Sequence, residues 1–369
     1  MKQFSGTLLL IAMILNGVNA QHIVMDLGGP SHSGVFNTRP LRNYSKILWK
    51  TDLKSYGYMN CIIDDGILYV SGLSYNSDLN KIIGHLFAIR SGDGSIKWQN
   101  TIDQNISSPV LKDSVLFYGS DDKNGKQYAV DVNTGHVLWD FSTALASCWP
   151  PAIVGDYNYF GSHGNMFYVV NNTTGDLVLD RIVEGGICCC PSVVGDVIYF
   201  TDLRGKLRAY STKENKDIWV FESGEGSNNP PAIVNGVAYM INKGGTLYAI
   251  DTKTGKLKWS YKTDDSMFRS PAINDTIATV ITTNGHLYAF DTTDGTVLWE
   301  TRKPGLGYTN TAICDDIVYV GCADRHLYAF KLKTGQELWN VETDAPVNTP
   351  LIDNGVVYFT SGNYLYAIK

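Results

Sequence analysis

Three consecutive cysteines, Cys188 to Cys190, are the residues in this sequence whose types and spacing are best suited to chemistry. Adjacent thiols can form a disulfide, and thiolates bind soft metals. Cys148 stands 40 residues before Cys188 and occupies the same position relative to a proline. We expect a structural disulfide, either between Cys148 and Cys188 or between neighbours at 188–189 or 189–190. A ligand-facing or redox role is the alternative. No second cluster or histidine at ligand spacing accompanies the cysteines, so we predict no metal site.

The carboxylates and histidines give no sign of an acid–base site. Paired aspartates fall in segments that we predict to be turns or loops, where aspartate bends or caps the chain: Asp64–Asp65, Asp121–Asp122, Asp264–Asp265 and Asp315–Asp316. No nucleophile elbow, phosphate loop or zinc signature is present. We therefore predict no catalytic residues.

A sequence repeat predicts the secondary-structure elements that position these residues. A tryptophan returns about every 40 residues, with Leu179 in the one missed position, at Trp49, Trp98, Trp139, Trp219, Trp259, Trp299 and Trp339. A glycine stands four residues before most of them, at Gly94, Gly135, Gly175, Gly255, Gly295 and Gly335, and Asn215 replaces it once. Asparagine tolerates positive φ, so backbone geometry explains this column. A 40-residue period with short alternating runs predicts β-propeller blades.

Eight such units predict an all-β, eight-bladed propeller with four strands in each blade. The last unit lacks its fourth strand, because the chain ends at Lys369 after the third. Residues 46–50 (KILWK) resemble the missing strand, so we expect the N-terminal strand to complete the final blade and close the ring.

The remaining composition indicates an exported protein without catalytic or nucleic-acid-binding features. Residues 1–20 read as a signal peptide, residues 21–45 as a lead-in arm, and residues 46–369 as the propeller. No later segment is apolar enough to span a membrane. The net charge of −6 comes from dispersed carboxylates, which argues against nucleic acid as a partner. We expect a secreted monomer, periplasmic if the host is bacterial.

A candidate binding surface follows from the segments that join the outer strand of one blade to the inner strand of the next. In a propeller these segments meet at one mouth of the central channel, and here their residues vary while the strands repeat. The predicted ligand-binding ring comprises Tyr58, Trp149, Asn229, Phe268, Arg269, Tyr308 and Asn348. Its aromatic faces, amides and single guanidinium suit a sugar, a peptide or another planar polar ligand. The alternative is that these residues only pack and seal the channel mouth.

Repeats such as LYAIDTKTGKLKW closely resemble the β-propeller repeat of the pyrroloquinoline quinone (PQQ)-type superfamily, and the resemblance covers essentially the whole mature chain. The lead-in GGPSHSGVFNTRPL also resembles that of many members. By length and by its bare repeat, the chain is similar to the eight-bladed scaffold lipoprotein of outer-membrane assembly, although it lacks the lipid-bearing cysteine. The quinoprotein alcohol dehydrogenases are more distant. Their vicinal disulfide resembles Cys188–Cys190, but we find no counterparts of their calcium ligands or catalytic aspartate.

The resemblance implies a non-enzymatic scaffold that docks a protein or glycan partner through its loop faces and needs no cofactor. Two alternatives remain at this point. One is a PQQ- and calcium-dependent oxidoreductase in which Trp149 and the cysteines at 188–190 flank the quinone. The other is a carbohydrate-binding lectin, favoured by the aromatic residues of the predicted ring.

Overall fold

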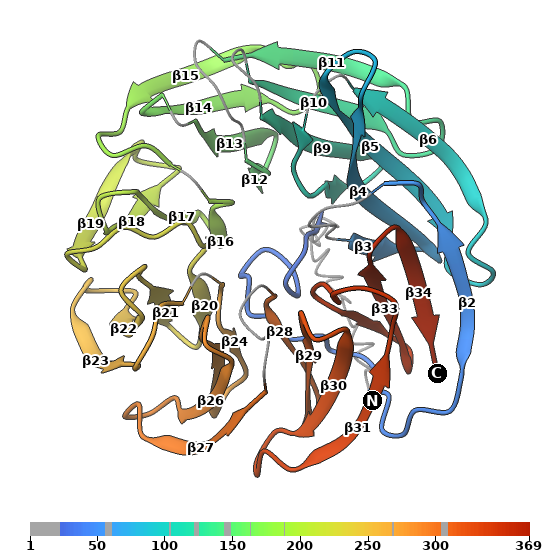
Figure 1. Cartoon of the computed structure of the whole chain (residues 1–369). Helices are drawn as coiled ribbons and strands as arrows, with labels where there is room; N and C mark the ends of the chain where they lie inside the picture. Colours follow the sequence, from blue (N-terminus) through green and yellow to red (C-terminus); the bar gives the residue numbers. More distant parts are fainter. Residues whose placement is uncertain are drawn as a thin grey trace, which may run out of the picture.

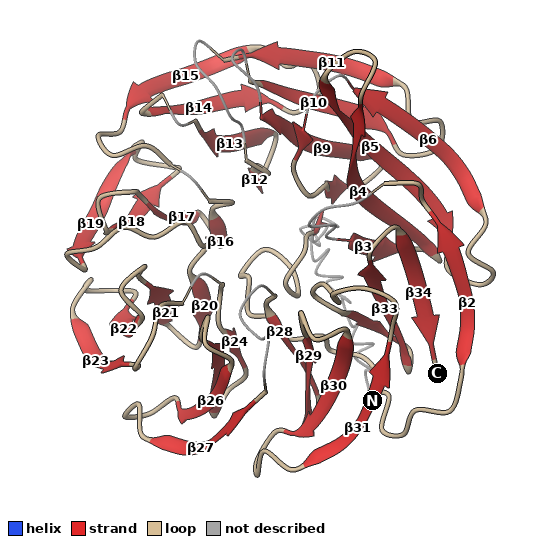
Figure 2. Cartoon of the chain, viewed as in Figure 1, coloured by secondary structure: helices blue, strands red, loops and turns tan. Residues whose placement is uncertain are grey.

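The computed structural model describes residues 23–55, 61–102, 105–121, 125–143, 149–162, 164–187, 189–267, 269–303 and 309–369. The regular elements of these residues are β-strands, and they form eight sheets arranged as a ring (Figures 1 and 2). The predicted eight-bladed propeller is therefore confirmed. Within the described ranges, no helix has the length and apolar character needed to cross a membrane. The predicted signal peptide lies outside the described residues.

The first four blades follow the chain from the inner strand to the outer strand. Blade 1 contains β3 (Cys61–Asp64), β4 (Ile67–Asn76), β5 (Lys81–Arg90) and β6 (Ile96–Ile102). Blade 2 contains β8 (Val110–Lys112), β9 (Val115–Asp121), β10 (Lys126–Asp131) and β11 (Val137–Ser142), with β1 (Ile23–Val24) and β7 (Asn105–Ile106) added to its sheet. Blade 3 contains β12 (Ala152–Val154), β13 (Tyr157–Gly161), β14 (Met166–Asn171) and β15 (Leu177–Ile182). Blade 4 contains β16 (Ser192–Val194), β17 (Val197–Thr201), β18 (Lys206–Ser211) and β19 (Lys216–Glu222).

The last four blades repeat this order until the final one, which takes its outer strand from the N-terminal part of the chain. Blade 5 contains β20 (Ala232–Val234), β21 (Val237–Ile241), β22 (Thr246–Asp251) and β23 (Leu257–Lys262). Blade 6 contains β24 (Ala272–Ile273), β25 (Ile277–Ile281), β26 (His286–Asp291) and β27 (Val297–Arg302). Blade 7 contains β28 (Thr311–Cys314), β29 (Ile317–Gly321), β30 (His326–Lys331) and β31 (Glu337–Glu342). Blade 8 contains β32 (Leu351–Asp353), β33 (Val356–Ser361), β34 (Tyr364–Ile368) and β2 (Ile47–Asp52).

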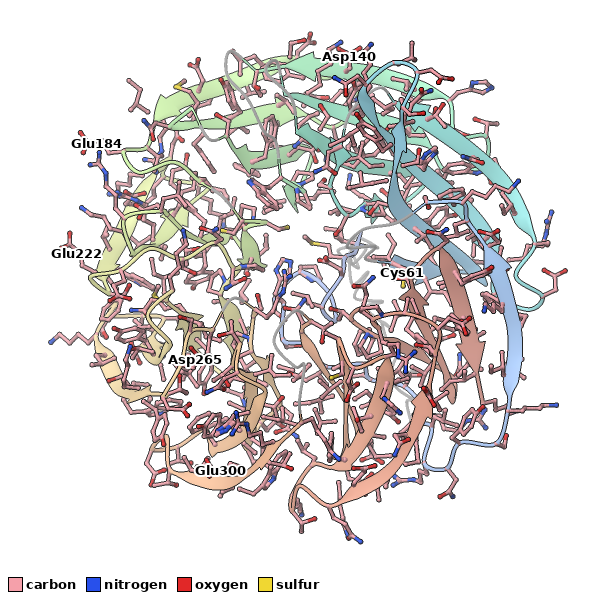
Figure 3. All side chains as sticks on the ribbon, in the orientation of Figure 1. Cys61, Asp140, Glu184, Glu222, Asp265 and Glu300 are labelled. Atoms are coloured by element: carbon pink, nitrogen blue, oxygen red, sulfur yellow. The ribbon has the colours of Figure 1, made fainter. Side chains whose placement is uncertain are left out.

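Burial follows the position of each strand in its blade. All five residues of β29 are buried, because neighbouring blades cover both faces of the middle strands. The outer strand β27 instead alternates exposed and half-buried residues. Figure 3 shows the charged residues Asp140, Glu184, Glu222 and Glu300 at the outer rim. Charged side chains on these outer edges disfavour pairing with another sheet.

The ring closes as the sequence predicts. Strand β2 pairs antiparallel with β34, and the register places Trp49 opposite Ala367 and Thr51 opposite Leu365. Beyond the strand, the amide groups of Ser45 and Lys46 both donate to the Lys369 carbonyl at 2.8 Å. Blade 8 therefore holds the two ends of the propeller together by backbone hydrogen bonds.

The tryptophan column joins each blade to the next. The indole N–H of Trp259, for example, donates to the Thr292 carbonyl in the following blade at 3.0 Å. In the same turn lies Gly295, whose φ is +78°, and a Cβ added there would lie 2.5 Å from the Trp259 ring. The glycine column thus has two causes, the positive φ that the sequence predicts and the close approach of the preceding indole. Trp339 has no following blade turn to reach and donates instead to the Arg42 carbonyl of the arm at 3.1 Å.

The arm crosses the centre of the ring, where Figure 1 shows it in blue. Its strand β1 pairs with the inner strand β8 of blade 2. Its later carbonyl groups accept hydrogen bonds of 2.6 to 2.9 Å from inner-strand amides that stand 40 residues apart in blades 4 to 7, namely Pro30 from Val193, Ser31 from Ile233, Ser33 from Ile273 and Gly34 from Ile313. Inner strands have a free edge, so the arm satisfies amide groups that no neighbouring strand reaches.

Candidate functional site

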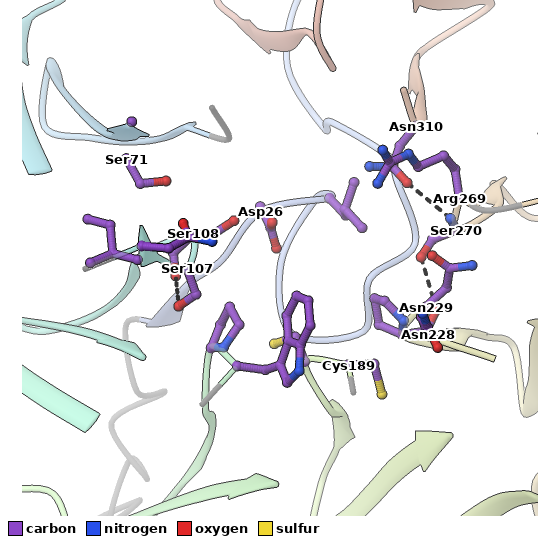
Figure 4. A pocket seen from close by; sticks show the side chains of 18 of the residues that line it. Asp26, Ser71, Ser107, Ser108, Cys189, Asn228, Asn229, Arg269, Ser270 and Asn310 are labelled. Atoms are coloured by element: carbon purple, nitrogen blue, oxygen red, sulfur yellow. Dashed lines mark hydrogen bonds between the residues drawn. The ribbon is translucent and has the colours of Figure 1, made fainter. Parts of the chain in front are cut away.

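A cavity of about 310 Å³ lies where the interblade segments meet (Figure 4). Trp149, Asn229 and Arg269, three members of the predicted ring, line it together. Ser107 and Cys189, which occupy the same position in their own units, line it as well. Asn310, from the next interblade segment, lines it too, so the structure brings the interblade segments of six successive units to one place, as the repeat predicts. That these residues bind a ligand stays a prediction.

The other predicted ring members are placed differently or lie outside the described residues. The side-chain amide of Asn348 donates to Thr360 at 2.8 Å, and Asn348 is not among the residues that line the cavity. Tyr58, Phe268 and Tyr308 lie outside the described residues, as do Cys148 and Cys188.

Hydrogen bonds between neighbouring units fix the segments that carry the lining residues. The Gln127 side chain donates to the Trp149 carbonyl at 2.7 Å, and the Thr201 hydroxyl donates to the Asn229 carbonyl at 2.9 Å. Ser270 joins the units on both sides of it, because its hydroxyl donates to the Pro230 carbonyl at 3.1 Å and its amide donates to Asn310 at 3.0 Å. A lining tied in this way is preorganised before any ligand arrives.

Asp26 and Leu27 add the arm to the lining of the cavity. The Asp26 carboxylate lies 3.6 Å from His32 Nε2, and His32 Nδ1 lies 3.0 Å from the Ser192 hydroxyl. His32 is completely buried, so this Asp–His–Ser contact holds the arm in place inside the ring. Asp26, His32 and Ser192 resemble a catalytic triad in type, but His32 and Ser192 do not line the cavity.

The cysteines near the cavity are thiols in this structure. Cys189 and Cys190 are both free, so the predicted vicinal disulfide between them is not formed. The reason is geometric. The two side chains pack in different places: Cys189 lies in the cluster with Ile187 and Phe200, while Cys190 lies in another with Met25. The bridges that would involve Cys148 or Cys188 lie outside the described residues.

Burial keeps these thiols protonated. It raises the pKa of Cys189 to about 11, although the Thr201 hydroxyl donates to its sulfur at 3.4 Å. Burial also raises the pKa of Cys190, and the nearby Asp26 carboxylate adds to the effect. A protonated thiol is a poor nucleophile and a poor metal ligand, so neither cysteine is prepared for chemistry at neutral pH.

Two groups of lining residues were missed by the reasoning from sequence. Ser270 stands one residue after the predicted Arg269, and Asn310 stands two residues after the predicted Tyr308, so extending the interblade column by one or two residues would have found them. Asp26 belongs to the arm, whose path across the ring is not encoded by the repeat, so no sequence pattern could have placed it. The polar lining consists mainly of amides and hydroxyls, with Asp26 and Arg269 as the charged side chains among the described residues.

A family model described as outer membrane protein assembly factor BamB matches the chain over residues 42–186, 123–240 and 203–369. These matches overlap and run to the last residue. The chain belongs to this family. Its repeats are thus those of the PQQ-like propellers that the sequence resembles. No curated protein sequence matches the chain.

Solved structures share the fold at low sequence identity. The crystal structure of BamB from Moraxella catarrhalis is 19% identical, with a TM-score of 0.72, and the match covers 88% of this chain and 97% of that one. A europium-containing methanol dehydrogenase is 14% identical, with a TM-score of 0.73 and coverage of 91% and 88%. Quinohemoprotein alcohol dehydrogenase from Comamonas testosteroni is 12% identical, with a TM-score of 0.76 and coverage of 92% and 79%. The BamB family and the dehydrogenases thus share one architecture with this chain.

The described residues around the cavity do not fit a quinone held with calcium. Calcium takes about six to eight oxygen ligands, usually with several carboxylates. Asp26 is the one carboxylate among the described lining residues, and it already faces His32. Arg269 is the one cationic side chain there to meet the acid groups of PQQ. In the part of the chain that the structure describes, no group of three histidine, cysteine, aspartate or glutamate residues could hold a metal ion.

Proposed function

We propose that this BamB-family chain is a non-enzymatic scaffold that docks a protein partner on the face where the cavity opens. The family model supports this proposal, because it spans the propeller from residue 42 to residue 369 and carries the description of an assembly factor. The observation that carries it is the one long departure from the repeat, the β4–β5 hairpin beside the cavity.

The hairpin has the features of a contact surface. Strands β4 and β5 pair over ten residues each, twice the length of the β21–β22 pairing. Near its tip, Tyr75, Leu79 and Ile82 are 51%, 57% and 47% exposed. Exposed apolar side chains clustered on one projection indicate contact with another molecule. At its base, Ser71 and Leu73 line the cavity, so hairpin and cavity form one continuous surface.

The base of the hairpin is braced, which gives the tip a fixed position. The Ser74 hydroxyl lies 2.6 Å from His85 Nε2, and the Gln99 side-chain nitrogen lies 3.0 Å from His85 Nδ1. The His85 ring also stacks on Phe87 with 5.8 Å between centroids. A rigid projection loses little conformational entropy on binding, which favours a docking role.

Site-specific photocrosslinking tests the proposal. A photoreactive amino acid replaces Leu79 at the tip, and the matched control replaces Leu298, which is 45% exposed on the outer strand β27. In the cells that make the protein, we expect position 79 to give one discrete protein adduct and position 298 to give none. Equal adducts from both positions, or no adduct from position 79, would contradict the proposal.

We also propose that the chain is exported, as the predicted signal peptide and the family description favour. N-terminal sequencing of the protein from its source should then begin at Gln21. A retained Met1 would overturn this part. Titration with PQQ and Ca²⁺ tests the oxidoreductase alternative, for which a saturable visible absorbance at one equivalent is the required result.

A further inference from the structure

We propose that the cavity is a binding site for a sugar that carries a carboxylate. This inference is tested separately from the protein-docking function, because sugar binding is measured at the cavity and partner docking at the tip of the hairpin. It rests on the side chains that line the cavity and on their arrangement.

The polar groups that line the cavity suit the hydroxyls of a sugar. A sugar hydroxyl both donates and accepts, and the same is true of amide and hydroxyl side chains. Asn228 and Asn229 provide amides on one side of the cavity, and Ser108 provides a hydroxyl on the opposite side (Figure 4). These groups come from separate units and surround a compact space. That arrangement matches a ring with hydroxyls around its edge better than an extended peptide, whose polar groups lie along a line.

Trp149 gives the cavity an aromatic wall. Trp149 is half-buried in the lining, and its backbone carbonyl is held by Gln127. An indole presents a flat apolar face, on which the C–H groups of a sugar ring can pack. A cavity of about 310 Å³ is near the lower end of the range for small-ligand sites, which favours a ligand about one ring in size.

Two charged side chains, Arg269 and Asp26, are among the described residues that line the cavity. Arg269 lines the cavity, and a guanidinium can pair with a carboxylate through two parallel hydrogen bonds. Asp26, the acidic residue of the lining, faces His32 at 3.6 Å. In Figure 4, Arg269 lies beside Asn310 and Ser270, while Asp26 lies nearer to Ser108. The cavity therefore distinguishes an acidic sugar from its neutral counterpart.

The test uses D-glucuronate and D-glucose, two sugars that differ at the carboxylate alone, with binding measured by ligand-observed NMR and calorimetry. We expect glucuronate to bind at least tenfold more tightly than glucose. Arg269→Gln should abolish that preference, and Trp149→Ala should weaken both sugars at least tenfold. Arg302→Gln, at an exposed arginine of the outer strand β27, is the matched control and should leave binding unchanged. Melting curves of each variant verify that the ring remains folded.

Three results would overturn the proposal. Equal affinities for the two sugars would show that Arg269 does not recognise the carboxylate. No glucuronate binding at about 50 mM, well beyond the millimolar range of weak specific sites, would show that the cavity is not a sugar site. A short peptide with a free C-terminal carboxylate could also displace glucuronate. If that peptide binds at least tenfold more tightly than its amidated form, the cavity is a site for the C-terminus of a protein chain and not for a sugar. None of these results bears on the photocrosslinking from Leu79.

Discussion

At the residue scale, one contact between neighbouring blades lacks both the tryptophan and the glycine of the repeat, because Leu179 and Asn215 stand in their places. Each glycine of the column makes room for the indole of the preceding tryptophan, which lies 36 or 37 residues before it, or 45 residues before it for Gly94. Asn215 occupies the glycine position after Leu179, and it keeps a positive φ of +54°. A Cβ at this position would collide with an indole, so the smaller Leu179 accompanies it. Arg181 and Arg208 instead bind Asp217 at 2.7 and 2.8 Å.

A double-mutant cycle tests this coupling. Leu179→Trp alone should lower the free energy of unfolding by about 1–3 kcal/mol, because the new indole meets the Asn215 side chain. Asn215→Gly alone should change stability by less than about 1 kcal/mol, because glycine adopts the same φ. The double variant should recover most of the loss from Leu179→Trp, which urea unfolding will measure as a favourable interaction energy. Additive effects would show that the two positions are independent.

The buried thiols make stability sensitive to alkaline pH. Burial raises the pKa of Cys61 to about 12 and that of Cys189 to about 11. An unfolded thiol ionises near pH 8.5, so the stabilisation is fully present below that pH and is lost as pH rises toward 11–12. Between pH 8.5 and 10, the free energy of unfolding should fall by about 2 kcal/mol for each such thiol.

Urea unfolding at several pH values, together with alkylation followed by mass spectrometry, measures this effect. Cys61→Ala should reduce the pH dependence of the free energy of unfolding by the amount that one thiol contributes. Cys61 and Cys189 should also resist iodoacetamide at pH 8 in the native chain. Rapid alkylation of either residue without unfolding is the contrary outcome.

At the scale of elements, the closing strand β2 determines whether the ring holds together. Trp49 points inward, where its indole donates to the Ser91 carbonyl at 2.9 Å and packs on Tyr358 with 5.9 Å between ring centroids. Leu48, its neighbour, is 39% exposed. Substitutions at these two positions therefore distinguish the stability that comes from ring closure from the stability that comes from the exposed face of the strand.

Replacing these neighbours gives a matched pair of variants. Trp49→Ala should destabilise the protein by about 3 kcal/mol, because it removes a large side chain between blades 8 and 1. Leu48→Ala should change stability by less than about 0.5 kcal/mol, as expected of an exposed position. Deletion of residues 41–50 should lower the melting temperature far more than either, since it removes the strand. A small, equal effect of both substitutions would mean that closure contributes little.

At the scale of the whole molecule, the repeat explains what the sequence could predict. Eight blades, the closing strand and the interblade segments around one cavity all follow from the 40-residue period that successive units share. The arm follows from nothing of this kind, because Pro30 and Gly34 act through backbone carbonyls that carry no sequence signal. The contribution of Asp26 to the cavity could not be predicted for the same reason. Asn348 hydrogen-bonds to Thr360 and does not line the cavity, and the alignment of repeat positions could not predict where its side chain points.

The arm also links distant blades, and this link can be measured. It accepts hydrogen bonds from Val193, Ile233, Ile273 and Ile313, one amide in each of four blades, and the buried His32 holds it through Ser192 at 3.0 Å. His32→Ala removes that anchor, so all four amides should exchange hydrogen together and at least tenfold faster, because one segment protects them all. The middle-strand amides of Tyr199 and Tyr239 serve as controls and should remain protected within their own blades. A variant lacking residues 23–34 should raise the exchange of the same four amides. Independent changes at the four positions would instead mean that each blade protects its own inner strand and that the arm only lies against them.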